Sequence, residues 1–380
     1  MNQVELLINQ FLEEARNPKQ TVTNVMVSTG KKAFGCFPIY VPEEIIYAAG
    51  VLPVGMWGGQ TQGSKVNAYI QSFCCSIMRA NMEQGMAGTY DFLDGIIIPT
   101  FCDTMKAILA NWPVAVPHVK VIPFVYPQNR TSEYSAQFLI SQFRNFQSNL
   151  ENLLSKKISE ADIENSFLTY EKYRVAMREF VELVNYYPKT LNPKIRHMII
   201  KASNFNDKAV YTKRLRHLME SIKEMPQERV HGPKVVITGL MAEPEQFLDL
   251  FTENGYTFVA DDLAHESRQF RTRARSEGTA IEKMAYRIID LRGCPFFYEE
   301  NKSRGTLLKT LAKKYNADAV VVCMFKFCDP EEFDYPVYKN ELDKDGINIL
   351  YLEIEQQMDS VAQLRTRIQS FSEMIMNEIN

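Results

Sequence analysis

The sequence of 380 residues lacks the short motifs by which many nucleotide-binding and metal-binding proteins are recognised. It has no Gly-x-Gly-x-x-Gly and no P-loop, so the chain is not expected to hydrolyse ATP. It has no Cys-x-x-Cys pair, which argues against a zinc ribbon and against a thioredoxin-type site. Because its five histidines form no His-x-x-x-His pair and no Ser-His-Asp pattern stands out, neither a zinc enzyme nor a hydrolase is expected.

The chain also has little net charge and no long apolar run. Its 43 basic and 46 acidic residues give a net charge of -3, which indicates neither a nucleic-acid nor a membrane partner. No uninterrupted apolar stretch is long enough to span a bilayer, and the first ten residues contain no basic segment ahead of an apolar one. We therefore expect a soluble, cytoplasmic protein.

Strands and helices alternate in two parts of the sequence, which is typical of a parallel α/β fold. Between them, residues 133–228 contain no glycine and follow helical periods. The predicted architecture is α/β, with two Rossmann-like or flavodoxin-like parallel-sheet domains joined by a helical segment. The expected limits are residues 1–132, 133–232 and 233–380.

The individual elements are expected from apolar periodicity and from turn residues. Pro42 suits the first position of a helix that ends at Gly50, and residues 17–29 are expected as a polar interval. Strands are expected at residues 51–54, 93–98, 120–124, 234–239, 256–260, 319–323 and 347–352. Helices are expected at residues 4–16, 70–86, 244–254, 277–291, 307–315, 331–345 and from 361 onward.

Two of the predicted strands are followed closely by the same three residues, Phe-Cys-Asp. The continuous apolar runs at 93–98 and 319–323 are typical of strands buried on both faces, and they deliver Cys102 and Cys328 to the strand ends. Loops beyond the carboxyl ends of parallel strands commonly hold ligands. The repeat also suggests that the two α/β parts are distant structural repeats.

A third cysteine position, the pair Cys74-Cys75, completes a set that could bind metal. Three thiolates are what an iron-sulfur cluster with one open iron needs. The alternative is that these cysteines are small buried hydrophobic residues, as free cysteines commonly are. The chain has seven cysteines, an odd number, and lacks a signal peptide, so disulfides are not expected.

Five segments, in this order, resemble the 2-hydroxyacyl-CoA dehydratase family, which also contains benzoyl-CoA reductase subunits. The resemblance covers nearly the whole chain and is greatest to β subunits of 2-hydroxyglutaryl-CoA dehydratase and similar fermentative enzymes. The segments are Gly35–Gly50 (GCFPIYVPEEIIYAAG), Cys75–Arg79 (CSIMR), Pro99–Asp103 (PTFCD), Asp261–Arg268 (DDLAHESR) and Phe327–Glu332 (FCDPEE).

The resemblance implies an oxygen-sensitive (R)-2-hydroxyacyl-CoA dehydratase built as an αβ heterodimer. Each subunit of such an enzyme holds one [4Fe-4S] cluster by three cysteines, here Cys75, Cys102 and Cys328. Cys75 is preferred to Cys74 because the family pattern places its cysteine directly before a small hydroxyl residue, here Ser76. An ATP-hydrolysing iron-sulfur activator supplies one electron, and a ketyl radical of the substrate then loses its 2-hydroxyl group. The 2-hydroxyacyl-CoA is held at or near the α-type subunit, and a bound FMN is left open.

Further candidates come from residues near these segments. Glu44 could act as an acid or base, or could simply stabilise a helix start. Ser267 and Arg268 are expected to bind a cofactor from a loop that follows a strand ending at Ala260, although Arg268 could instead pair with Asp261 or Asp262. Phenylalanines are expected either to keep water from the cluster or to belong to the ordinary core; they are Phe73, Phe101, Phe325 and Phe327. The remaining cysteines are assigned to packing, with Cys36 as the first candidate for an exception; they are Cys36, Cys294 and Cys323.

Two alternatives to the dehydratase remain. The first is a reductase of the same family that acts on an aromatic acyl-CoA or carries a double-cubane cluster. The second is a relay or assembly module without chemistry of its own. The sequence does not decide the acyl group, the fourth ligand of the cluster, or whether substrate also reaches this chain.

Overall fold

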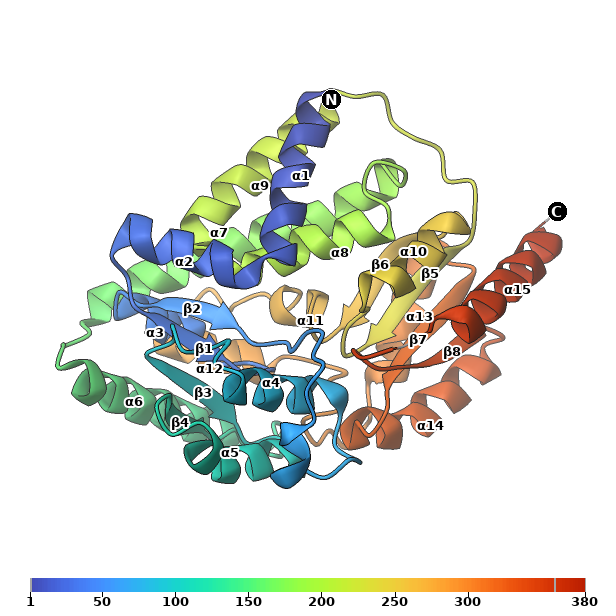
Figure 1. Ribbon diagram of the computed structural model, residues 1–380. Helices are drawn as coiled ribbons and strands as arrows, with labels where there is room; N and C mark the ends of the chain where they lie inside the picture. Colours follow the sequence, from blue (N-terminus) through green and yellow to red (C-terminus); the bar gives the residue numbers. More distant parts are fainter. Residues whose placement is uncertain (1, 359, 380) are drawn as a thin grey trace.

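A computed structural model describes residues 2–358 and 360–379, and its strands form two four-stranded parallel sheets (Figure 1). The first sheet has the order β2-β1-β3-β4 and the second the order β6-β5-β7-β8, so both follow the flavodoxin-like order 2-1-3-4. The α/β prediction is confirmed, and the two sheets repeat one topology. The strands are β1 (Ala33–Cys36), β2 (Leu52–Gly55), β3 (Gly95–Pro99), β4 (Lys120–Phe124), β5 (Lys234–Gly239), β6 (Thr257–Leu263), β7 (Ala319–Phe325) and β8 (Asn348–Ile354).

Helices surround the sheets and fill the space between them (Figure 1). In the order of the chain, the first are α1 (Gln3–Arg16), α2 (Pro18–Thr29), α3 (Glu43–Ala48), α4 (Ser76–Met86), α5 (Asp103–Ala115), α6 (Ser135–Leu154), α7 (Glu160–Leu183), α8 (Pro193–Ala202) and α9 (Lys208–Lys223). They are followed by α10 (Glu245–Glu253), α11 (Ser267–Phe270), α12 (Ala280–Ile289), α13 (Arg304–Tyr315), α14 (Asp329–Lys344) and α15 (Ala362–Ile379). Short 3-10 turns occur at η1 (Lys65–Ala68), η2 (Val184–Tyr186) and η3 (Ser203–Phe205).

The central strands are the most apolar part of the chain. Every residue of β3 and β7 is buried, because helices cover both faces of each sheet. Burying such side chains is the main favourable contribution to folding, at roughly 25 cal/mol per Å² of apolar surface. The expected strands at 120–124 and 234–239 match β4 and β5 at both ends.

The helical layer, formed by α1, α7, α8 and α9, has a core of its own. Phe11 of α1 packs edge-on against Tyr211 of α9, and Met177 and Phe180 of α7 belong to the same buried cluster. Helix α6 instead packs on the first sheet, where Phe143 stacks on Phe124. Packing thus puts α1 with the helices and α6 with the sheet, while the domain limits at 132 and 232 stay a prediction.

Three local expectations were wrong. Residues 18–29 form α2 instead of a polar interval, because Pro18 starts a helix well and Gly30, in the left-handed region, ends it. The helix expected at 70–86 begins only at Ser76. Strand β6 continues past Ala260 to Leu263, because buried arginines neutralise the carboxylates that follow Ala260.

In the described part of the chain, none of the helices combines the length and the apolar character that crossing a membrane requires.

Candidate metal centre

One cavity brings together cysteines from both sheets. Cys102 follows β3, Cys328 follows β7, and Cys75 reaches the same cavity from the loop before α4. Cys74 is not among the lining residues, so the geometry favours Cys75 of the pair. The remaining lining residues are Pro38, Ile39, Trp57, Ile77, Met78, Thr104, Met105, Leu240, Phe296, Phe327, Asp329 and Pro330.

Each of the three cysteines is the residue directly before a helix. Cys75 precedes α4, Cys102 precedes α5 and Cys328 precedes α14. The first amides of a helix have no partner within it and carry the positive end of its dipole. Three helix starts therefore face one cavity, an arrangement that stabilises negative charge on the sulfur atoms.

The pKa values of the three thiols are raised. Burial, with a smaller contribution from Cys102, raises the pKa of Cys75 to about 12, although the backbone amides of Met78 and Ile77 act against it. Burial also raises the pKa of Cys102, and burial together with Glu331 and Cys75 raises that of Cys328. The thiols influence one another, so ionising all three requires a compensating positive charge in the cavity.

The spacing of the sulfurs differs from that of a site for a single ion. Within the described ranges, the one group of three ligating side chains whose atoms lie within 4.8 Å of one another is His197, His265 and Glu266. By this criterion the three cysteines do not form a compact site for one ion.

That histidine group is an ion-pair network. His197 contacts Glu266 through Nδ1 at 2.8 Å and Glu243 through Nε2 at 3.1 Å, so both ring nitrogens face carboxylates. These contacts outweigh burial and raise the pKa of His197. An imidazole that donates from both nitrogens has no lone pair left for a metal.

The expected phenylalanine shield is only partly present. Phe101 and Phe325 are buried, and Phe101 stacks on Tyr126 with ring centroids 4.6 Å apart. Phe73 is 66% exposed and does not line the cysteine cavity, whereas Phe327, although 42% exposed, is one of its lining residues. Phe327 has a φ of 62°, a backbone conformation that turns the chain between β7 and Cys328.

Glu44 lies in a second cavity. It is buried and contacts Arg174 Nη1 at 2.6 Å, and Arg287 Nη2 lies at 3.8 Å. Burial raises the pKa of Glu44, but the two arginines outweigh it and leave the pKa below its usual value. The second cavity shares three walls with the cysteine cavity, namely Pro38, Ile39 and Trp57. Glu44 is thus an ion-paired carboxylate, and its role as an acid or base stays a prediction.

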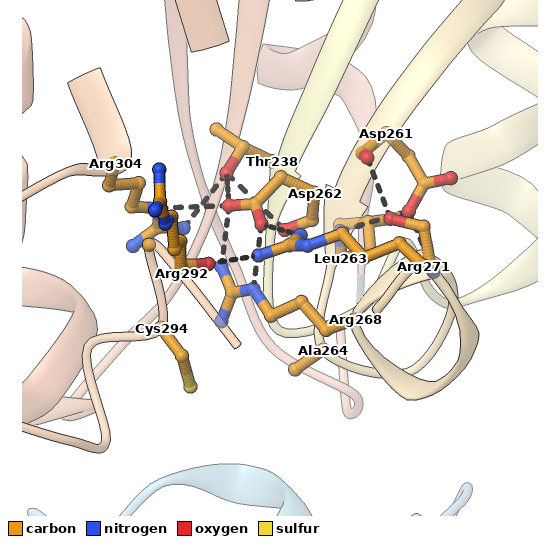
Figure 2. A network of polar contacts seen from close by, with 12 residues as sticks. Thr238, Asp261, Asp262, Leu263, Ala264, Arg268, Arg271, Arg292, Cys294 and Arg304 are labelled. Atoms are coloured by element: carbon orange, nitrogen blue, oxygen red, sulfur yellow. Dashed lines mark hydrogen bonds and ion pairs between the residues drawn. The ribbon is translucent and has the colours of Figure 1, made fainter. Parts of the chain in front are cut away.

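Ser267 and Arg268 line neither cavity. The backbone amide of Ser267 donates to Asp261 Oδ1 at 2.9 Å. The Arg268 guanidinium donates to both carboxylate oxygens of Asp262, at 3.0 and 2.9 Å (Figure 2). Of the two alternatives for Arg268, the ion pair with Asp262 is the one present. The binding of a cofactor by these residues stays a prediction.

Cysteines assigned to packing have varied surroundings. Cys323 is buried within β7, Cys36 lines the cavity of Glu44, and the Sγ atom of Cys294 lies 3.2 Å from the Tyr40 hydroxyl. None of the three lines the cavity of Cys75, Cys102 and Cys328 among the described residues.

Two further residues near the cysteines had no clear signal in the sequence. Trp57 lines both cavities, and its position after a strand and before two glycines could have marked it as a loop residue at a site. Gln356 lies after β8, and its backbone amide donates to Ser76 Oγ at 3.0 Å, next to Cys75. A lone glutamine offers no such marker.

Comparisons with known proteins show the family of the chain. Residues 38–375 match the family described as 2-hydroxyglutaryl-CoA dehydratase, D-component. The chain is 40% identical over 377 residues to the lactoyl-CoA dehydratase subunit beta of Anaerotignum propionicum, with 99% of this chain and 100% of the relative covered. It is 36% identical over 375 residues to the (R)-phenyllactyl-CoA dehydratase beta subunit of Clostridium sporogenes, with the same coverage.

A third relative is the (R)-2-hydroxyglutaryl-CoA dehydratase, subunit beta, of Acidaminococcus fermentans. It is 32% identical over 378 residues, covering 98% of this chain and 100% of the relative. The resemblance seen in the sequence is confirmed: the chain belongs to the 2-hydroxyglutaryl-CoA dehydratase D-component family.

Proposed function

We propose that this chain is the β subunit of an (R)-2-hydroxyacyl-CoA dehydratase and that Cys75, Cys102 and Cys328 hold one [4Fe-4S] cluster. The observation that carries the proposal is the meeting of these cysteines, drawn from separate loops, in one cavity. The names of three relatives, all beta subunits of dehydratases that act on 2-hydroxyacyl-CoA thioesters, support the reaction class.

The chemistry of the donor set fits the cluster. Thiolates are the ligands that iron-sulfur clusters use, and three of them leave one iron open. The backbone amides at the starts of α4, α5 and α14 compensate negative charge on the sulfurs. Trp57, Met78 and Phe296 provide an apolar wall that limits the access of water. When bound, such a cluster supplies one-electron transfer at low potential.

The proposed division of labour follows from what the chain contains. A beta subunit implies an α-type partner, and we propose that this partner holds the 2-hydroxyacyl-CoA. A separate iron-sulfur activator would hydrolyse ATP and deliver the electron, which suits a chain without a P-loop. The present subunit would relay that electron toward the partner for elimination of water to the 2-enoyl-CoA. We place the complex in the cytoplasm and assign no role to FMN.

The test is reconstitution under anaerobic conditions. The chain is co-purified with its α-type partner, and the complex is analysed for iron and sulfide. With one cluster in each subunit, about four irons are expected per subunit. Activator, ATP and a panel of 2-hydroxyacyl-CoA thioesters are then added, and formation of 2-enoyl-CoA is followed by mass spectrometry. The expected result is turnover that requires both activator and ATP.

Other outcomes separate the alternatives. About twice the expected iron would indicate a double cubane, and a reduced acyl-CoA in place of an enoyl-CoA would indicate a reductase. A complex that carries full iron and gives no turnover with any thioester would contradict the dehydratase and favour a relay or assembly module.

A further inference from the structure

We infer that Arg268 is a positioning residue for Cys328, which it acts on through Glu331. The inference deepens the proposed function and rests on it, because it concerns the surroundings of one of the three sulfurs. Arg268 is fully buried, and it connects strand β6 to the first turn of α14, the turn that begins directly after Cys328.

The connection to Cys328 runs through one carboxylate. Glu331 lies three residues after Cys328, is 1% exposed, and accepts a hydrogen bond from Arg268 Nη1 at 2.8 Å on Oε1. Its other oxygen, Oε2, lies 2.7 Å from Nη2 of Arg304. The guanidinium groups of Arg268 and Arg304 therefore each bind one carboxylate oxygen of Glu331 and so fix the first turn of α14.

The other end of the connection is Asp262 of β6 (Figure 2). Arg268 binds it with two hydrogen bonds of 3.0 and 2.9 Å, which fixes the plane of the guanidinium. Arg304 Nε donates to Oδ2 of Asp262 at 2.9 Å, and Arg271 pairs with Oδ1. Figure 2 shows these three arginines converging on Asp262. The link from β6 to the first turn of α14 is therefore a chain of buried ion pairs and not a single contact.

The charges in this network balance. Its cations are Arg268, Arg271 and Arg304, and its anions are Asp262, Glu331 and Asp334. Removing one charge from a buried and balanced group leaves its partner uncompensated. Loss of Arg268 would add net negative charge near Cys328, and loss of Glu331 would add net positive charge.

The donors of the Arg268 side chain are already engaged within the chain. Nε, Nη1 and Nη2 of Arg268 are all engaged by carboxylates, and the side chain is 0% exposed. We therefore assign Arg268 an influence on the sulfur of Cys328, of the kind that residues hydrogen-bonded around a metal site exert on the metal ligands. Such an influence acts on the geometry of Cys328 and on the electrostatic potential there.

The first measurement is the reduction potential of the cluster in the full chain, by anaerobic titration followed by electron paramagnetic resonance. Positive charge stabilises the reduced, more negative cluster. Arg268→Gln should therefore shift the potential to a more negative value and Glu331→Gln to a less negative one. Arg268→Lys, which keeps the charge, and the double variant should both lie between the two single variants and near wild type.

The second measurement is hydrogen exchange by mass spectrometry on the metal-free chain. In Arg268→Gln, the peptide covering the first turn of α14 should exchange faster than in wild type, while peptides from α1 should not change. The matched control is Arg275→Gln. Arg275 lies close to Arg268 in the sequence and also pairs with an aspartate, Asp290, at 2.8 Å, but it is exposed. The control should alter neither the exchange nor the potential.

The outcomes separate this inference from the proposed function. A wild-type chain without iron would contradict the proposed function. In that case only hydrogen exchange in Arg268→Gln would test whether Arg268 positions the turn after Cys328. Potentials that do not move, or that move in the same direction in both single variants, would overturn the inference in a chain that holds its cluster. Unchanged exchange in Arg268→Gln would overturn it as well. If Arg268→Gln does not fold, Glu331→Gln alone must give a less negative potential than wild type.

Discussion

Cys74 and Cys75 are adjacent, and both are buried, yet Cys75 lines the cavity and Cys74 does not. If the proposed cluster is present, Cys75→Ala should therefore lose most of its iron when purified anaerobically. Cys74→Ala should retain iron near the wild-type amount, because its sulfur is not a ligand. Iron and sulfide per chain, measured together with the visible absorption of the cluster, give the answer. Equal loss of iron in both variants would contradict the assignment.

The sequence allowed prediction of the cysteines but not of their surroundings. Cys102 and Cys328 each follow a continuous apolar run, so a local pattern located them. The partner of Arg268 lies 63 residues away at Glu331, in another element, and no local pattern links the two. Pairs that depend on tertiary packing of this kind become visible only in the folded chain.

At the scale of the element, Gly239 shows how tightly neighbouring strands approach. It ends β5 with a φ of 136°, and a Cβ atom there would lie 2.1 Å from the carbonyl oxygen of Cys323 in β7. Gly239→Ala should lower the free energy of unfolding by about 2 to 5 kcal/mol, because backbone strain and overlap add together. Urea denaturation followed by circular dichroism measures the loss.

The matched control for this prediction is Gly30→Ala. Gly30 also has a positive φ, 68°, but a Cβ atom there would meet nothing within 4 Å. The decrease in the free energy of unfolding of Gly30→Ala should therefore come from backbone strain only, about 1 to 2 kcal/mol. A loss as large in Gly30→Ala as in Gly239→Ala would show that overlap with Cys323 is unimportant.

Element boundaries were predictable where apolar periodicity and turn residues agreed, as at β4 and β5. They were missed where a side chain from elsewhere changed the local preference. Asp261 and Asp262 look like loop residues, but Arg196 and Arg268 neutralise them inside the fold and so β6 continues through both. Pro18 and Gly30, in contrast, were local signals for the ends of α2 that the polar composition of the segment obscured.

At the scale of the whole molecule, Gln356 joins the two sheets beside the cysteine cavity. Its Nε2 donates to the carbonyl oxygen of Trp57 at 2.5 Å, its Oε1 accepts from the amide of Gly59 at 3.0 Å, and its own amide donates to Ser76. Trp57, Gly59 and Ser76 all belong to the part of the chain that carries the first sheet, whereas Gln356 directly follows the second. No local pattern in the sequence could predict these contacts, because Gln356 lies 280 residues from Ser76 and 299 residues from Trp57 along the chain.

Gln356→Ala should therefore lower the free energy of unfolding by roughly 2 to 4 kcal/mol, because the buried partners of its side chain lose their hydrogen bonds. If the cluster is bound, the variant should also release iron faster to a chelator, since Ser76 adjoins Cys75. Gln369→Ala, on the exposed face of α15, is the control and should behave as wild type. Wild-type stability and iron release in Gln356→Ala would contradict a joining role.

Stability should decrease in mild acid, at pH values where carboxylates of ordinary pKa are still ionised. His265 is 3% exposed, and Asn204 Nδ2 donates to its Nε2 at 3.1 Å, which requires a neutral ring. Burial lowers the pKa of His265 from 6.5 to about 3. Below pH 6.5 the unfolded chain therefore binds a proton that the folded chain does not, and the free energy of unfolding falls as the pH falls.

The slope attributable to His265 should approach about 1.4 kcal/mol per pH unit between pH 6 and 4.5, the value for one proton. Carboxylates whose pKa is lowered in the folded chain affect the free energy of unfolding only at lower pH. For example, Arg196 and His197 outweigh burial and lower the pKa of Glu266 to about 2. The stability that Glu266 contributes is therefore lost mainly below its unfolded pKa of 4.5. His265→Gln, which cannot titrate, should flatten the curve above pH 4.5 and leave the steep loss below it. Urea denaturation at half-unit steps from pH 7 to 4 checks this, and an unchanged slope in His265→Gln would assign the mild-acid loss to other groups.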